Sequence, residues 1–179
     1  MAQLQDQGLL ANPDTSVTPE KVRDGIGLRI NGEDFRHTGD PDLPLLWYLR
    51  DVLRLTGTKY ADAKGGGGAD LVLVDGKAVS AITLPMARLA GKSVVTVEGL
   101  AGPDGLLHPL QQAFIDEDAI GCGYCTPGWL IAGVDLLRRK PHPTDADVDT
   151  LPNLCRCGCQ SRVRKAIHRT RGWLLGQQH

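Results

Sequence analysis

Four of the five cysteines in this chain lie in two short motifs that could bind metal together. The first motif, C-x2-C, holds Cys122 and Cys125, and the second, C-x-C, holds Cys155 and Cys157. If the helical segment between the motifs brings them together, four thiolates converge on one point. Clustered thiolates are the ligands of zinc and of iron–sulfur clusters. We therefore predict a metal centre at these four residues.

The spacing leaves two kinds of metal centre open. Zinc ribbons usually pair two C-x2-C knuckles, whereas one arm here is C-x-C. We expect each arm to hold one iron of a [2Fe–2S] rhomb, and we keep a zinc-binding interaction module as the alternative. A third possibility is a set of buried thiols without metal. Cys159, two residues after Cys157, could be a spare ligand, a redox-sensitive thiol or a small apolar filler, and we interpret it as structural.

Composition excludes several other functions. The formal net charge of −1 over 179 residues gives no electrostatic basis for binding nucleic acid or an anionic membrane. No apolar run approaches the ~18 residues of a spanning helix, so we expect no direct membrane insertion. Residues 1–24 are expected to form a polar extension without a secretory or twin-arginine pattern. We therefore expect a cytoplasmic protein, exported only if a partner carries the signal.

The first half of the chain, residues 25–98, has the patterns of a small mixed sheet. Alternating residues on either side of Asn31-Gly32 predict a hairpin over residues 26–36. An amphipathic helix is expected to begin at Leu45 and to end near Gly57. Further strands are predicted at residues 71–74, 77–83 and 93–98, and a short helix at residues 84–89. Four or five strands that grip one helix would form a β-grasp domain.

The second half, residues 99–179, has helical periodicity from Pro109 onward. We expect a small four-helix domain with the cysteines at helix ends and in the loops. Pro127 suits a first helical turn, and Pro141 suits a helix end. The predicted fold class is therefore α+β, with two domains joined near residues 99–105.

Several segments together resemble one known family. The motifs Gly121–Gly128 (GCGYCTPG) and Asn153–Gly158 (NLCRCG) resemble those of the iron–sulfur subunit of the xanthine oxidase family of molybdenum hydroxylases. That family includes bacterial aldehyde, carbon monoxide and isoquinoline oxidoreductases. The resemblance covers roughly residues 26–168 and includes the segments DPDLPLLWYLRD (40–51), LTGTKY (55–60), VDGKA (74–78) and HPLQQAF (108–114).

The resemblance implies a plant-ferredoxin-like β-grasp domain followed by a four-helix domain that binds a [2Fe–2S] cluster. It places the four cysteines at the ligand positions, and Gly121 and Cys157 near a molybdopterin cofactor held by a large partner subunit. The implied function is electron transfer in an oxidoreductase, whose partner subunit contains the catalytic residues and oxidises an aldehyde or an N-heterocycle. The alternative is a scaffold subunit with a structural cluster.

The first domain departs from the family pattern. Plant-type ferredoxins space their ligands C-x4-C-x2-C, with a fourth cysteine about a dozen residues later. Those positions fall here on Asp62, Gly67, Asp70 and Ile82. We therefore expect one cluster in the whole chain, and a solvated loop with exposed carboxylates in the first domain. Asp62 and Asp70 binding Ca²⁺ or Mg²⁺ is the alternative. The missing cluster suggests that the electrons pass to a flavin, haem or further iron–sulfur subunit.

Three smaller features concern the helical domain. Gly121 stands where the family usually has glutamine. Arg156, between two predicted ligands, would raise the reduction potential of a cluster, or it could be a capping or interface residue. His108, beside Pro109, is interpreted as a polar turn residue and not as a ligand.

Overall fold

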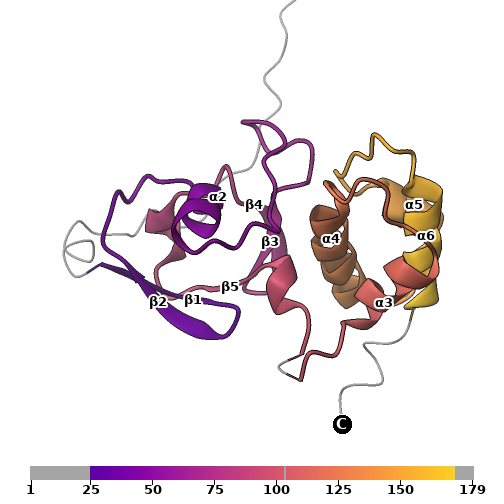
Figure 1. Ribbon diagram of the computed structural model, residues 1–179, viewed down its shortest axis with the longest axis horizontal. Coiled ribbons are helices and arrows are strands. Elements are labelled where there is room, and N and C mark those ends of the chain that lie inside the picture. The colour runs from indigo at the N-terminus through magenta and orange to yellow at the C-terminus, as the bar shows by residue number, and fades with distance from the viewer. Residues whose placement is uncertain (1–24, 103, 172–179) are drawn as a thin grey trace, which may run out of the picture.

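The computed structural model describes residues 25–102 and 104–171, in two parts packed side by side (Figure 1). One part is a sheet with a short helix, and the other consists of helices, as the sequence predicts. The predicted extension at residues 1–24 lies outside the described residues. The domain boundary at residues 98 and 99 stays a prediction.

A five-stranded mixed sheet forms the first part. Its strand order is β2-β1-β5-β3-β4, in which β1 and β5 are parallel and the other pairs are antiparallel. The predicted hairpin is confirmed, because Asn31 (φ 51°) and Gly32 (φ 89°) both adopt the left-handed backbone of a tight two-residue turn. The strands are β1 (Ile26–Ile30), β2 (Glu33–His37), β3 (Leu71–Val74), β4 (Lys77–Ser80) and β5 (Ser93–Val95).

Three predicted elements are shorter in the structure. The helix begins as α2 (Leu45–Trp47), continues as a π-helical turn (Tyr48–Val52) and stops before Arg54, whose φ is 61°. Strand β4 ends at Ser80 because the next two amides bond to Asp70. Strand β5 ends at Val95, since the N–H of Thr96 donates to the Asn31 side chain at 2.9 Å. Short 3₁₀ turns cover Met86–Leu89 and Val97–Gly99.

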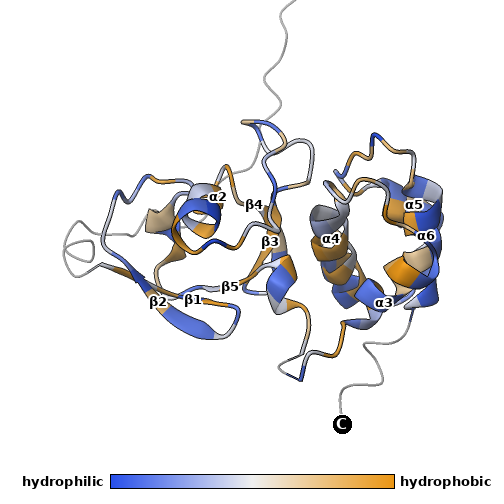
Figure 2. Cartoon of the chain, in the orientation of Figure 1, coloured by the Kyte–Doolittle hydropathy of each residue, from blue (hydrophilic) through white to orange (hydrophobic). Residues whose placement is uncertain are grey.

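Four helices form the second part, which confirms the predicted arrangement. They are α3 (Pro109–Asp116), α4 (Thr126–Arg139), α5 (Asp145–Asp149) and α6 (Gln160–Arg169). Helix α4 is buried from Gly128 to Leu137 because it lies between the sheet and the other helices. Its apolar residues share one core with strand β3 and with α3 and α6, whose outer faces are hydrophilic (Figure 2). Since this core spans both parts, α4 fixes the helices against the sheet.

The glycine-rich segment before β3 also packs against α4. The backbone oxygen of Gly68 lies so close to Gly128 that a Cβ there would come within 1.8 Å of it. Gly68, Ala69 and Asp70 are buried. The prediction of a fully solvated loop with exposed carboxylates is therefore wrong for Asp70, because the helical part covers this end of the loop.

His108 begins helix α3. Its Nδ1 accepts the N–H of Leu110 at 3.1 Å, and its own N–H donates to the Gln111 side chain at 2.9 Å, so the two side chains form a capping box. Burial, helped by the nearby Arg138 guanidinium, lowers the pKa of His108 from 6.5 to about 4. The interpretation as a non-ligand turn residue fits this capping role.

No helix among residues 25–102 and 104–171 combines the length and the apolar composition needed to cross a bilayer.

The His108 cap predicts a specific pH dependence of stability. Because the folded pKa lies below the unfolded value, the stabilisation is full above pH 6.5 and is lost as the pH falls towards 4. We expect that loss to be roughly 1–2 kcal/mol, less than full linkage because the ring is partly exposed. His108→Asn keeps a capping oxygen and cannot titrate, so its denaturation profile should be flatter between pH 6.5 and 4. Identical pH profiles for the two proteins would contradict the assignment.

Candidate metal centre

The two cysteine motifs occupy the entrances to helices α4 and α6. Cys122 and Cys125 lie in the turn before α4, and Cys125 is its N-cap residue. Cys155 and Cys157 lie between α5 and α6, and Cys159 is the N-cap residue of α6. Gly123 (φ 80°) and Gly158 (φ 75°) supply the left-handed backbone on which both turns depend.

The structure brings the four predicted thiols together as two pairs. The thiol of Cys122 is in hydrogen-bonding contact with that of Cys157, and the thiol of Cys125 with that of Cys155. Each pair takes one cysteine from each motif. This pairing differs from the expectation that each motif acts as a separate arm, because the two turns face each other across the entrances of α4 and α6.

The same arrangement makes one thiol of each pair more acidic. The backbone N–H of Tyr124, and next the Cys157 thiol, lower the pKa of Cys122. Burial alone would raise the pKa of Cys155, but the N–H of Cys159 and the Cys125 thiol outweigh it and lower the value. The N–H of Cys159 lies 3.4 Å from the Cys155 sulfur. Backbone donors therefore already point at the sulfurs that would carry negative charge.

The second thiol of each pair is held protonated. Burial, with the Cys155 thiol beside it, raises the pKa of Cys125 to about 12. At Cys157 the backbone N–H of Cys122 favours the thiolate, but the Cys122 thiol and desolvation together raise the pKa. Two adjacent thiols cannot both ionise cheaply without a cation between them, since like charges repel. A metal that displaces both protons would remove this penalty.

The pairs fit a two-iron cluster better than one zinc ion. In the part of the chain that the structure describes, no three His, Cys, Asp or Glu side chains are placed to hold a single metal ion. A tetrahedral zinc needs four ligands around one point, whereas a [2Fe–2S] rhomb takes two thiolates at each iron. The donor set and its division into pairs therefore match the rhomb.

Gly121 and Cys159 pack against these thiols. A Cβ on Gly121 would lie 2.7 Å from the Cys157 Cβ and 3.2 Å from the Cys159 sulfur, so a larger residue would require the second motif to shift. Cys159 is buried in the helical core, and its sulfur receives an N–H of Arg162 at 3.4 Å. Its placement fits the interpretation of Cys159 as a structural residue.

Exposed side chains surround the motifs. Ile120, Tyr124 and Leu154 are large apolar residues that project into solvent, with Leu154 72% exposed. Arg156, between two of the cysteines, is also exposed. The thiols of Cys122 and Cys157 share this exposed side, whereas Cys125 and Cys155 are partly covered.

The four positions predicted to have lost their cysteines lie in the first part of the chain. The Asp62 carboxylate accepts backbone N–H groups of its own loop, and the buried Asp70 carboxylate accepts from Ser80 and Ile82. Gly67 and Ile82 have no side-chain donor for a metal. The cation-binding alternative at Asp62 and Asp70 gains no support, because these carboxylates are engaged with protein donors and no third metal-binding side chain joins them within residues 25–102 and 104–171.

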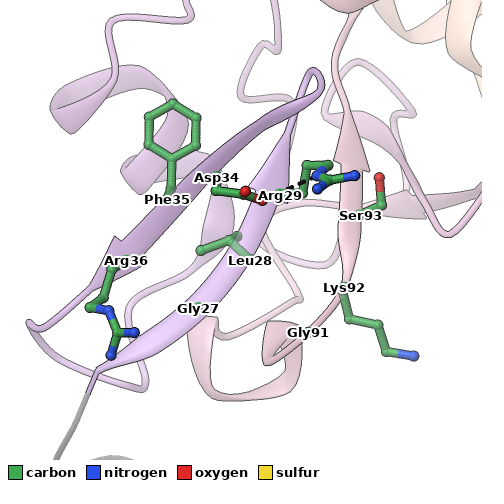
Figure 3. Close-up of a pocket in the computed structure, with 9 residues that line it drawn as sticks. All are labelled: Gly27, Leu28, Arg29, Asp34, Phe35, Arg36, Gly91, Lys92 and Ser93. Atoms are coloured by element: carbon green, nitrogen blue, oxygen red, sulfur yellow. Dashed lines mark hydrogen bonds and ion pairs between the residues drawn. The ribbon is translucent and has the colours of Figure 1, made fainter.

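An open cavity of about 520 Å³ lies elsewhere, on the sheet beside β1, β2 and β5 (Figure 3). Its cations are partly neutralised, since Arg29 pairs with Asp34 at 3.1 Å and Lys92 pairs with Asp75 at 2.9 Å. None of the predicted site residues lines it. This cavity is therefore not part of the candidate metal centre.

Sequence reasoning missed three residues that connect the two parts of the chain. Tyr124, Asn153 and Leu154 donate hydrogen bonds to backbone oxygens of the glycine-rich loop. Their position beside the cysteines was the only signal in the sequence, because the partners lie more than 60 residues away.

The fold and the paired thiols define the class of [2Fe–2S]-binding proteins, and comparisons with known proteins agree. A family model described as "[2Fe-2S] binding domain" matches residues 96–168. The smaller of two similar matches is to nicotinate dehydrogenase of Pseudomonas putida, one subunit of which is 42% identical over 146 residues, or 80% of this chain and 92% of that subunit. The alpha subunit of isoquinoline 1-oxidoreductase from Brevundimonas diminuta is 42% identical over 143 residues, covering 78% and 93%.

A solved structure gives the same result. The chain superposes on quinoline 2-oxidoreductase from Pseudomonas putida 86 with a TM-score of 0.76 and 33% identity, covering 80% of this chain and 90% of that one. The chain belongs to the iron–sulfur subunits of the xanthine oxidase family of molybdenum hydroxylases. The resemblance seen in the sequence motifs is confirmed.

The unequal thiols predict an order of alkylation in the metal-free chain. Cys122 is exposed and has a lowered pKa, so it should react first with a limiting pulse of iodoacetamide near pH 8. Cys125, with its raised pKa, and the buried Cys159 should react at least about tenfold more slowly. Peptide mass spectrometry measures the order. Alkylation of Cys125 ahead of Cys122 would contradict the described pairing.

Proposed function

We propose that this chain is the electron-transfer subunit of a molybdenum hydroxylase and that Cys122, Cys125, Cys155 and Cys157 hold its [2Fe–2S] cluster. The observation that carries the proposal is the pairing of thiols across the two motifs, at the exposed entrances of α4 and α6. Each iron would take one cysteine from each motif. Such a site tethers both helices through the metal, so binding the cluster would also stabilise the helical part.

The residues around the thiols prepare the site for negative charge. When bound, a [2Fe–2S] cluster supplies exchange of one electron at a time. The N–H groups of Tyr124 and Cys159 point at the sulfurs of Cys122 and Cys155. Hydrogen bonds to cluster sulfurs favour the reduced state, and burial on the other side limits solvent access. Arg156 adds an exposed cation beside the site.

The exposed side of the site suits a large partner subunit. Ile120, Tyr124 and Leu154 form an apolar fringe around the motifs, and such residues are enriched in the centre of interfaces. We place the partner's molybdopterin cofactor nearest to Gly121 and Cys157, where the absence of a side chain at Gly121 leaves the approach open. The partner would oxidise an aldehyde or an N-heterocycle. Support comes from the relatives, which are named for nicotinate, isoquinoline and quinoline.

The route by which electrons leave differs from a two-cluster relay. Asp62, Gly67, Asp70 and Ile82 offer no thiolate in the first domain, residues 25–98. The acceptor, which could be a flavin, a haem or a further iron–sulfur subunit, would therefore dock within electron-transfer range of the helical domain, residues 99–179. A scaffold subunit with a structural cluster is less favoured, because the matched subunits are named as parts of dehydrogenases and oxidoreductases.

Anaerobic reduction of the intact complex tests electron transfer. When an oxidisable aldehyde or N-heterocycle is added, we expect the visible absorption of the cluster to bleach and its EPR signal to appear. Cys155→Ala removes a proposed ligand and should lower this response at least about 100-fold. Cys159→Ala is the matched control in the same loop and should keep the signal, since Cys159 is packed in the core.

A complex whose molybdenum is reduced by substrate while the cluster stays oxidised would contradict the proposal and favour the scaffold alternative.

A further inference from the structure

The loop at residues 60–70 has no regular secondary structure, and the Asp62 carboxylate holds it together from inside. One oxygen accepts the N–H of Lys64 at 2.7 Å and of Gly66 at 3.2 Å. The other accepts the N–H of Gly67 at 2.8 Å. A single side chain thus fixes several amides that a glycine-rich segment would otherwise leave unordered.

Asp70 performs a similar function at the end of the loop. Its carboxylate is buried, and it accepts the hydroxyl of Ser80 at 2.5 Å and the N–H of Ile82 at 3.1 Å. The backbone oxygen of Asp70 also accepts the N–H of Ala81 at 3.1 Å. The loop is thereby joined to the segment that follows β4.

These bonds join the four former ligand positions in pairs. In plant-type spacing the first two ligands would fall at residues 62 and 67, and the last two at residues 70 and 82. The Asp62 carboxylate bonds to Gly67, and the Asp70 carboxylate bonds to Ile82. Each carboxylate therefore connects two positions that a cluster would have connected through iron.

The loop that these carboxylates shape holds both cysteine motifs. Its backbone oxygens accept the Tyr124 hydroxyl at Tyr60 (2.5 Å), the Asn153 amide at Gly68 (2.6 Å) and the Leu154 N–H at Gly67 (3.3 Å). Tyr124 lies between Cys122 and Cys125, and Leu154 immediately precedes Cys155.

Gly67 is the point where the two sets of bonds meet. Its N–H is fixed by Asp62 and its oxygen is bonded to Leu154, so only one residue separates the Asp62 carboxylate from the second cysteine motif.

We propose that Asp62 and Asp70 are positioning residues, which have taken over the structural part of a lost cluster and hold both motifs of the remaining site in place through the loop. This inference rests on the proposed function, in which those motifs bind the [2Fe–2S] cluster. The emptied loop is thus a rigid support for the remaining site, and its shape influences the geometry around the cluster.

The test compares Asp62→Ala, Asp62→Asn and a control, Asp40→Ala, in the purified complex. Asp40 is a suitable control because its exposed carboxylate accepts one backbone N–H, from Asp42 at 2.9 Å, in the same part of the chain. Two readouts are needed: amide hydrogen exchange of residues 122–125 and 153–157, and the g-values and midpoint potential of the cluster.

In Asp62→Ala we expect exchange in residues 153–157 to rise about fivefold, the factor for the net contribution of one hydrogen bond. The g-values and the midpoint potential should shift with it. Asp62→Asn retains an oxygen acceptor and should give an intermediate result, which also serves if the alanine variant does not fold. Asp40→Ala should match the wild type in both readouts.

Faster exchange confined to residues 60–70, with residues 153–157 and the EPR signal unchanged, would overturn the inference. A wild-type complex that shows no [2Fe–2S] signal would instead overturn the proposed function. The exchange measurement would still decide whether Asp62 positions the second motif, so the two failures are distinguishable.

Discussion

Mutual repulsion between ionised thiols is the constraint on which the metal centre depends. The helical part places four cysteines in contact as two pairs, and in each pair one thiol is more acidic while its neighbour is held protonated. Without metal, such a pair can release only one proton at little cost. The site is therefore arranged for a cation-containing cluster that neutralises all four thiolates.

Burial of α4 between the sheet and the other helices makes this arrangement possible. Helix α4 begins at the first cysteine motif and shares its core with β3, so the motif is fixed relative to the sheet. The second motif is fixed by Asn153 and Leu154, which bond to the glycine-rich loop. The ferredoxin-like half is thus a structural support for the site even though aspartate, glycine and isoleucine stand at its own four ligand positions.

The sequence predicts those features that depend on local interactions. The Asn31-Gly32 turn, the apolar periodicity of α4 and the cysteine spacing are set by neighbouring residues, and each prediction agrees with the structure. The pairing of cysteines across motifs and the burial of Asp70 depend on how distant segments meet. An aspartate in a glycine-rich stretch looks solvated in sequence, and only the covering helix and the Ser80 hydroxyl reveal its burial.

The central claim is that one cluster, held by the helical half, serves the whole chain. Spin quantification by EPR on the chemically reduced chain within its complex tests this claim most directly, with iron and sulfide analysis of the same sample. We expect one [2Fe–2S] signal from this chain, with two irons per copy, and its loss in Cys155→Ala. Two distinct [2Fe–2S] signals from this chain, or zinc in place of iron, would contradict the claim.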